Sequence, residues 1–581
     1  MINLLLIFFV IKYFMKVFKF IITLILQVVF FLTIINTIHA KNIGKYQDAN
    51  KISKYFSGIL SFNDNEYANS YNYLRALDGL EDNHLTYSKL YQYSLINIEK
   101  FTEAYRYSKK LERKGLDSFE SNLIIGSFYL KNKRYRNAAK YFEKLSEGSY
   151  DQSLEGLLSE SLNNWISFLD VNNERAIELI DSMNPRFENI KKIQRTFSYC
   201  FYGSKLANKE FKKLTLNSKT NFARYHFFHA NFLYQSGNKK KSVKVIDNSL
   251  KVYPGNLILN QLKEDINSQN SKLSNKFDCK NLSNIVAEIF YIVSNALSGQ
   301  SLYSLSNFYL NLAKYLNPEF TSFDALYAEN FYMTENYEKA KKIYKRVKDN
   351  GKFYHWHASK QISNILIIEK KEDLAQKLLK KAFDDIDEPA VYQIFDYAEF
   401  LKNSERYEIS IDYYSKVLSL INKDHYLYPE ASDGRGISYE RLGKWKKAEE
   451  DLLNSLSVAP DQAYVINYLA YSWIEQGINI EKSLKMLRKA NDLKQNDGYI
   501  IDSLGWALFK LKKYKEAKEH LELAVRIMPS DPIVNDHFGD SLWMNNQNIQ
   551  ARYYWNYVLG LEKTENKLKE KIKNKLIFGI K

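Results

Sequence analysis

The stretch "DSLGWALFKLKKYKEAKEH", Asp502 to His520, decides the fold of this chain. Its apolar residues recur at helical spacing, yet Gly505 stands between Leu504 and Trp506 in the middle of the first helical run. A glycine inside a helix costs on the order of 1 kcal/mol relative to alanine. Something in the folded chain must therefore offset that cost at this position.

The same pattern recurs along the chain with a fixed period. Small residues stand in the place of Gly505 at intervals of 34, 35 and 34 residues, a second small residue follows twelve or thirteen positions later, and a bulky apolar residue follows four positions after that. The three sets are Gly436, Ala470, Gly505 and Gly539; Ala448, Ser483, Ala517 and Ala551; and Leu452, Leu487, Leu521 and Trp555. A period of this length predicts a solenoid.

Each unit reads as two helices of about a dozen residues joined by a short turn such as "RLGKW" or "KLKKY". Two antiparallel helices can cross closely only where one of them lacks a bulky side chain. We therefore expect Gly505 to lie at a crossing with the helix that carries Ala517.

These residues resemble the tetratricopeptide repeat (TPR) family, whose unit is a 34-residue helix-turn-helix. The resemblance implies an all-α fold, an α-solenoid that winds as a right-handed superhelix of helix pairs. Upstream, the pattern persists mainly as spacing, and residues 150–220 and 262–283 show no clear register. The upstream first-helix positions are Gly58, Gln92, Gly126, Ala230, Ser294, Ala328, Ser363 and Ala398.

Composition agrees with a helical chain and suggests its divisions. The 581 residues include only 8 Pro and 21 Gly but 45 Tyr and 35 Phe, which can fill a long repeating core. The polar stretch 263–284 predicts a break between a degenerate solenoid, 41–262, and a regular one, 285–561. Residues 562–581 form a basic segment with Leu568, Ile572 and Leu576 on one stripe, which predicts a capping helix.

The N-terminus has the parts of a secretory signal in residues 1–40. Lys16 and Lys19 precede an apolar run, Ile38-His39-Ala40 supplies a cleavage site, and translation starting at Met15 would give a typical leader. We expect cleavage after Ala40 and a periplasmic protein. The alternative is a leader retained as an inner-membrane anchor, since the apolar run approaches membrane-spanning length.

Cys200 and Cys279 both lie in the exported part, where an oxidising compartment would allow them to pair. Residues 79 positions apart in a solenoid need not be neighbours, however, so the expectation is two free or half-buried thiols.

The net charge of +16 falls to +13 without the three lysines of the leader. The remaining lysines are interleaved with glutamates on helix surfaces, as in "KKYKEAKEH", which is typical of a solvated face. Because the sequence contains no nucleic-acid module, nucleic acid is not an expected partner.

Motifs for chemistry are weak. "SGNKKKS", Ser236 to Ser242, lacks the upstream glycine of a phosphate-binding loop. His226 with His229 and His355 with His357 form two pairs, neither with a third ligand at suitable spacing. We expect a non-enzymatic protein without cofactor or metal; the alternative is a metal-dependent hydrolase that uses the histidine pairs.

In the resembled family, the first helix of each unit lines a concave groove. Asp433, Asn467, Asp502 and Asp536 recur at one place on these helices, accompanied on the same face by Tyr464, Tyr471, Tyr499 and Trp506. Such a row suits an extended polypeptide, because the carboxylates and the amide accept hydrogen bonds while the rings cover apolar groups. The alternative is that these side chains cap or solubilise helices near their N-termini. Either reading makes them exposed, so alanine at Asp502 and Asp536 should cost little stability.

A narrower resemblance concerns the C-terminal repeats, from "YVINYLAYSWIEQG" to "SDPIVNDHFGDSLW". They are similar to repeats of large bacterial envelope TPR proteins, some of which are adapters that bind a carboxy-terminal processing protease and deliver cell-wall hydrolases to it. The resemblance implies a scaffold whose partners are an envelope protease and its substrates. Those adapters are typically lipoproteins, whereas this sequence has no cysteine near its cleavage site.

Overall fold

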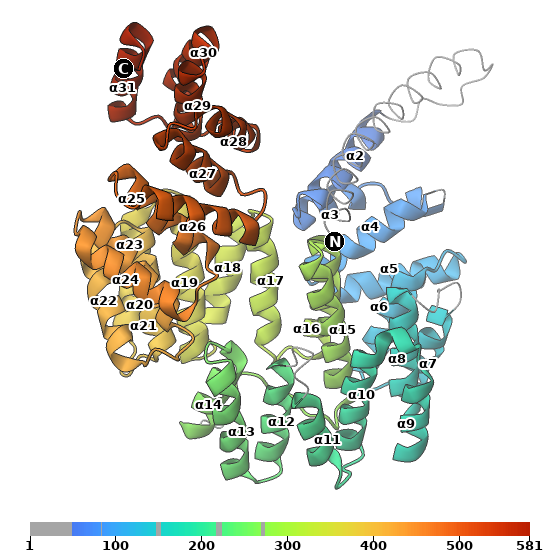
Figure 1. Cartoon of the computed structure of the whole chain (residues 1–581). Coiled ribbons are helices and arrows are strands. Elements are labelled where there is room, and N and C mark those ends of the chain that lie inside the picture. The colour runs from blue at the N-terminus through green and yellow to red at the C-terminus, as the bar shows by residue number, and fades with distance from the viewer. Residues whose placement is uncertain (1–48, 83, 147–152, 217–222, 269–272, 581) are drawn as a thin grey trace, which may run out of the picture. The chain divides into compact units, whose positions relative to one another are not determined.

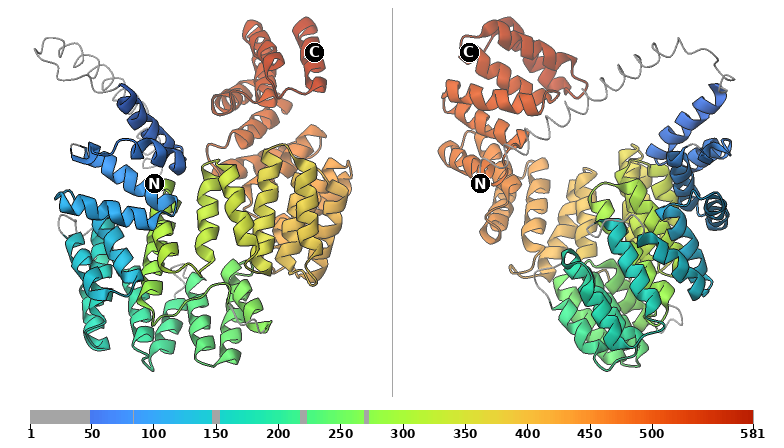
Figure 2. Two further views of the ribbon diagram at one scale, coloured as in Figure 1. Left: turned by 180° about the vertical axis from the view of Figure 1, so that it is seen from behind. Right: turned by 90° about the vertical axis from the view of Figure 1, so that its right-hand side faces the viewer.

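The computed structural model describes residues 49–82, 84–146, 153–216, 223–268 and 273–580 (Figure 1). Throughout these ranges the regular structure is helical, without a β-strand, as the repeat pattern predicts. The chain forms two compact units. Figure 2 shows their helices from two further sides. The first comprises the chain up to Glu210 together with Phe277–Asn336, and the second comprises Phe211–Lys276 and Tyr337 onward.

The described part of the first unit contains twelve α-helices and short 3-10 turns at Leu80–Asp82, Lys144–Ser146 and Pro185–Phe187. Its α-helices are α2 (Ala49–Asn63), α3 (Tyr67–Arg75), α4 (Leu85–Asn97), α5 (Phe101–Arg113), α6 (Phe119–Lys131), α7 (Tyr135–Glu143), α8 (Leu154–Ser167), α9 (Asn173–Ser182), α10 (Glu188–Phe201), α15 (Leu282–Gly299), α16 (Tyr303–Leu316) and α17 (Ser322–Met333). Helix α11 (Ala207–Thr215) spans the boundary between the units.

The second unit carries the most regular repeats. Its helices are α12 (Ala223–Gln235), α13 (Lys239–Val252), α14 (Leu257–Asn267), α18 (Tyr337–Lys348), α19 (Lys352–Ile368), α20 (Glu372–Asp384), α21 (Val391–Asn403), α22 (Tyr407–Leu420), α23 (Tyr428–Arg441), α24 (Trp445–Val458), α25 (Ala463–Glu475), α26 (Ile480–Leu493), α27 (Gly498–Lys510), α28 (Tyr514–Ile527), α29 (Pro532–Met544), α30 (Asn548–Gly560) and α31 (Asn566–Phe578).

The small residues of the repeat lie at helix crossings, as expected. A Cβ added to Gly505 would lie 2.6 Å from Cγ of Leu521, and one added to Gly539 would lie 2.5 Å from the ring of Trp555. The same interval of 16 residues joins Gly126 to Phe142. Ala470, Ala448, Ser483, Ala517 and Ala551 are completely buried. The helix penalty of each glycine is thus offset by the close approach of a large side chain from the second helix.

The turns between paired helices give a second measure of the repeat. In most of these turns a residue adopts the left-handed conformation with φ from 57° to 77°. These residues are Asn65, Glu99, Lys133, Gly203, Gly237, Ser301, Glu335, Lys370, Glu405, Gly443, Gly477, Lys512 and Asn546. Gly203 and Gly237 are 34 positions apart, so the repeat continues through part of the stretch where the sequence shows no clear register.

The first unit is not a simple linear stack. Helix α16 crosses the ends of successive N-terminal helix pairs, where Ser304 donates to Asn65 (3.0 Å), Asn311 donates to Asn97 (3.1 Å) and Lys131 donates to the carbonyl of Leu316 (3.1 Å). Residues more than 200 positions apart therefore share one core. The division of the structure consequently differs from the predicted boundaries at 262 and 285, since α15–α17 pack with the N-terminal helices.

The described parts of the polar stretch 263–284 pack against other helices. Its first part completes α14, Asn275 exchanges hydrogen bonds with the Tyr354 hydroxyl at 2.8 and 3.1 Å, and Phe277 packs against Phe197. The chain passes from the second unit to the first between Lys276 and Phe277. The chain therefore changes from one unit to the other within the predicted break.

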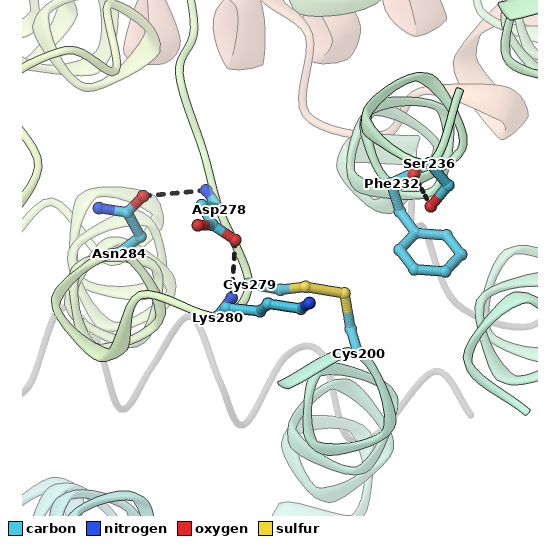
Figure 3. Close-up of a disulfide and its surroundings, with 7 residues drawn as sticks. All are labelled: Cys200, Phe232, Ser236, Asp278, Cys279, Lys280 and Asn284. Atoms are coloured by element: carbon cyan, nitrogen blue, oxygen red, sulfur yellow. Dashed lines mark hydrogen bonds between the residues drawn. A yellow bond between two sulfur atoms is a disulfide. The ribbon is translucent and has the colours of Figure 1, made fainter. Parts of the chain in front are cut away.

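Cys200 and Cys279 form a disulfide, so the expectation of two free thiols is wrong (Figure 3). Cys200 lies on α10, Cys279 precedes α15, and their Cα atoms are 5.9 Å apart. Both side chains are buried. They are neighbours because the chain leaves the first unit after α10 and returns to it at Phe277, which a linear solenoid does not do.

The C-terminal helix α31 packs against α30 and extends the last core. Ile572 is completely buried, with Leu568 and Leu576 packed against the same cluster, so the predicted apolar stripe faces the last repeat.

The predicted leader, residues 1–40, lies outside the described residues. None of the described helices combines the length and apolar character needed to cross a bilayer.

Candidate functional site

The predicted groove residues lie on α23, α25, α27 and α29, the first helices of four successive pairs in the second unit. The structure divides them into two groups. Tyr464 and Tyr499, near the N-termini of α25 and α27, are 56% and 58% exposed. Asp502, Asp536 and Trp506 are only 5–8% exposed. The expectation that the whole row is exposed is therefore wrong for these three residues.

Asp502 is held inside the repeat by a residue of the next helix pair. Its carboxylate lies 3.0–3.1 Å from Nδ1 of His537, and the His537 ring stacks on Trp506 at a centroid distance of 3.9 Å. Burial acts to lower the pKa of His537, but the nearby Asp502 carboxylate outweighs it, and the net pKa is raised. Trp506 in turn donates from Nε1 to Glu475 at 2.6 Å. These side chains couple α25, α27 and α29.

Asp536 is neutralised by the C-terminal helix. Lys575 of α31 contacts Asp536 at 2.6 Å and Asp540 at 2.7 Å. Burial, followed by the Asp536 charge, raises the pKa of Asp540 to about 6. Trp555 also donates its Nε1 hydrogen to Asp540 at 3.0 Å. The two carboxylates thus anchor α31 to α29.

The alternative reading, that this row caps helices, does not describe Asp502 or Asp536 either. The caps are made five residues earlier, where the side chain of Asp497 accepts from the backbone N–H groups of Tyr499 and Ile500. Asp531 makes the equivalent cap at the start of α29.

Asp433 and Asn467 have unsatisfied polar atoms, unlike the two later members of the row. Asp433 is half-buried and forms no ion pair or hydrogen bond with any residue that the structure describes. Burial, reinforced by Glu399 and Glu430, raises its pKa to about 7 in spite of the nearby Lys402. Oδ1 of Asn467 is buried and accepts no hydrogen bond from the described part of the chain. The half-buried Asp433 carboxyl therefore remains open to a ligand, whereas the Asn467 oxygen is enclosed.

The exposed aromatic and apolar side chains near the starts of these helices form a second row. Tyr464, Tyr499 and Ile533 occupy equivalent positions on α25, α27 and α29, three residues before Asn467, Asp502 and Asp536, and Ile533 is 44% exposed. Lys494 lies 3.8 Å from the centre of the Tyr464 ring, whose hydroxyl donates to Asp497 at 3.1 Å. The Tyr471 side chain lies deeper, and burial raises its pKa. The accessible part of this face is therefore aromatic and apolar.

A cleft of about 250 Å³ lies on the preceding helices of the same unit. The sequence reasoning missed its residues because it considered only the last four units. Tyr392 and His357 stand at the positions equivalent to Tyr464 in earlier repeats, so extending the register upstream from Tyr464 would have found them.

The structure places the two histidine pairs on α12 and α19. Burial lowers the pKa of His229 and that of His357 to about 4, and His229 stacks on Phe211. No group of three or more His, Cys, Asp or Glu side chains could hold a metal ion in the described residues. A larger cleft of about 770 Å³ beside His355 is lined by several charged side chains, and Lys352 there pairs with Glu264 at 2.9 Å.

Comparison with known proteins finds the tetratricopeptide repeat family model at residues 119–147 and 501–531. The "TPR repeat-containing protein PA4667" of Pseudomonas aeruginosa is 26% identical over 181 residues, which are 31% of this chain and 29% of that protein. The match thus spans less than a third of the curated relative.

Solved structures that resemble parts of the chain include MamA from Desulfovibrio magneticus (16% identity, 30% of this chain and 97% of that chain, TM-score 0.27). Another is YrrB, described as a TPR protein with an unusual peptide-binding site (17% identity, 34% and 97% coverage, TM-score 0.27).

Proposed function

Because the chain carries tetratricopeptide repeats, we propose that it is a non-enzymatic scaffold that binds another protein, as an extended segment, along the first helices of its C-terminal repeats. The observation that supports this proposal is the exposed row of Tyr464, Tyr499 and Ile533. Aromatic side chains of this kind supply much of the binding energy at protein interfaces. The helices that carry these side chains are held together by the buried contacts of Asp502 with His537 and of Asp536 with Lys575. The row is therefore pre-organised for binding.

We further propose that the protein acts outside the cytoplasm. The leader-like residues 1–40 and the buried disulfide between Cys200 and Cys279 support this location, since disulfides persist in oxidising compartments. The narrower role, an adapter between an envelope protease and its substrates, rests on the similarity of the C-terminal repeats to envelope TPR proteins. Such an adapter would use the row to hold one of the two partners.

Site-specific photo-crosslinking tests the proposal. Benzoylphenylalanine in place of Tyr499 should crosslink a defined protein in cells, because the Tyr499 side chain is exposed on the proposed binding face. The same residue in place of Tyr553, which is 67% exposed on α30, is the matched control. Mass spectrometry then identifies the crosslinked peptide.

A protein crosslinked from Tyr499 but not from Tyr553 supports the scaffold, and recovery of a protease or its substrate supports the adapter role. Equal crosslinking from both positions, or none from Tyr464 and Tyr499, would contradict binding at this face.

A further inference from the structure

The cleft beside the proposed binding face is walled by aromatic rings from three elements of the second unit. Helix α19 supplies Phe353 and Trp356, α21 supplies Tyr392 and Phe395, and the segment before α23 supplies Tyr426 and Leu427. Trp356 is buried and packs edge-on against Phe383, whereas Tyr426 is 50% exposed at the mouth. The cleft therefore combines aromatic walls with the polar side chains of His357, Lys360 and Asp396.

The charges within the cleft compensate one another. Lys360 pairs with Asp396 at 2.8 Å, and Trp356 donates to the same carboxylate at 3.4 Å. Burial, followed by the Lys360 charge, lowers the pKa of His357 to about 4, so this ring is neutral at pH 7. Without a net charge, the cleft suits an apolar or aromatic side chain rather than an ion.

The neighbouring helix α23 presents two carboxyl groups that form no ion pair with the described residues. Glu399 of α21 pairs with Lys402 and accepts from the Tyr414 hydroxyl. Glu430 and Asp433, one helical turn apart on α23, form no ion pair with any residue in the described ranges. Two carboxyl groups without an ion pair are complementary to a basic side chain, whose charge would favour their ionised form.

We propose that α19, α21 and α23 bind an extended polypeptide segment that places an apolar or aromatic side chain in the cleft and a lysine or arginine against Glu430 and Asp433. This inference rests on the proposed protein-binding function and adds the chemistry of the partner. It extends the binding face upstream of the four repeats that carry Tyr464 and Tyr499.

The spacing between the two partner side chains follows from the helix geometry. Neighbouring packed helices lie about 8–10 Å apart, and an extended chain advances about 3.3 Å per residue. A side chain in the cleft, beside Tyr392 of α21, is therefore about three residues from one that reaches α23. The recognised pattern is Φ-x-x-(Lys/Arg), in which Φ is an apolar or aromatic residue.

Four fluorescein-labelled peptides test this pattern on the full chain. Each is a glycine-serine decapeptide that carries Phe-x-x-Arg, Phe-x-x-Glu, Ala-x-x-Arg or Ala-x-x-Glu, and binding is measured by fluorescence anisotropy. The Phe-x-x-Arg peptide should bind about tenfold more tightly than either single replacement, which corresponds to about 1.4 kcal/mol.

Variants of the chain assign the two contacts separately. Asp433→Lys should reverse the preference between Arg and Glu peptides, and the isosteric Asp433→Asn should weaken it, which guards against a folding defect in the first variant. Glu408→Lys, the same charge change at an exposed site on α22, should leave all four affinities unchanged. Tyr426→Ala should abolish the advantage of Phe over Ala.

Equal affinity for the four peptides, no binding of any of them, or a preference for Arg that persists in Asp433→Lys would overturn this inference. The protein-binding function would survive such a result if Tyr499 still crosslinked a partner. If both experiments failed, the whole face would be excluded as a binding surface.

Discussion

Gly505 shows how one residue sets the distance between two helices. An added Cβ would lie 2.6 Å from Cγ of Leu521 and 3.2 Å from the backbone nitrogen of the same residue. The side chain could rotate away, but the backbone of α28 could move only by separating the helix pair. Gly436 has more space, since its closest neighbours lie at 3.1 Å.

We predict that Gly505→Ala lowers the free energy of unfolding by about 1–3 kcal/mol, the usual cost of overpacking a core. Urea denaturation followed by circular dichroism measures the shift in midpoint. Gly560→Ala is the control, because nothing lies within 4 Å of its added Cβ. An equal midpoint for Gly505→Ala and the natural protein would contradict the close-crossing argument.

The sequence predicted the role of Gly505 correctly because a repeat reveals which positions face the neighbouring helix. It could not predict the burial of Asp502 and Asp536. Their partners, His537 and Lys575, are 35 and 39 residues away, and Lys575 lies on a helix outside the repeat pattern. A period shows which residues are equivalent, but not which of them a later segment covers.

At the scale of elements, α31 stabilises the last repeat by charge as well as by apolar contact. Lys575 is the cation within reach of both Asp536 and Asp540, and all three side chains are largely buried. Removing one member of a buried ion pair commonly costs about 3–5 kcal/mol, because the remaining charge stays desolvated.

We therefore predict that Lys575→Met destabilises the C-terminal repeats by about that amount at pH 8. The folded-state pKa of Asp540 is already raised to about 6, so its contribution to stability is present below the unfolded pKa and is lost as pH rises through the folded value. Loss of Lys575 raises that pKa further. The defect should consequently be larger at pH 8 than at pH 5 in urea denaturation.

Lys571→Met, at an exposed position of the same helix, should have little effect at either pH. A defect of Lys575→Met that is the same at pH 5 and pH 8 would indicate lost packing rather than unpaired carboxylates. The capping role of α31 could be predicted from its apolar stripe, but its ion pairs could not, since lysines surround that stripe on all sides.

At the scale of the whole molecule, the chain departs from one-dimensional stacking. Helix α14 is not followed by the second helix of a repeat, and it packs against α12, α13 and α19. The next described helices, α15 and α16, pack across the ends of the first helix pairs. The contacts of Asn311 with Asn97 and of Ser304 with Asn65 are polar. A 34-residue period cannot predict them, because both partners lie at turns or on faces that an ordinary solenoid leaves to solvent.

The disulfide joins the two points of the first unit between which the chain runs through the second unit. Residues 211–276 belong to the second unit, while Cys200 and Cys279 on either side of them belong to the first. The bond therefore fixes where the chain leaves and re-enters the first unit. In the loop-entropy model, a crosslink across 79 residues restricts the unfolded chain by about 4–5 kcal/mol.

We predict that Cys200→Ser with Cys279→Ser, or reduction of the natural protein by dithiothreitol, lowers the urea midpoint of the first unit. Reductant should not change the midpoint of the double variant, which controls for effects unrelated to the bond. Protein isolated from its cellular compartment and denatured without reductant should resist alkylation at both cysteines, as read by mass spectrometry. Alkylation of both thiols in that sample would contradict both the bond and the oxidising location. An intact bond with an unchanged midpoint after reduction would show that the other contacts of α15–α17 hold them without it.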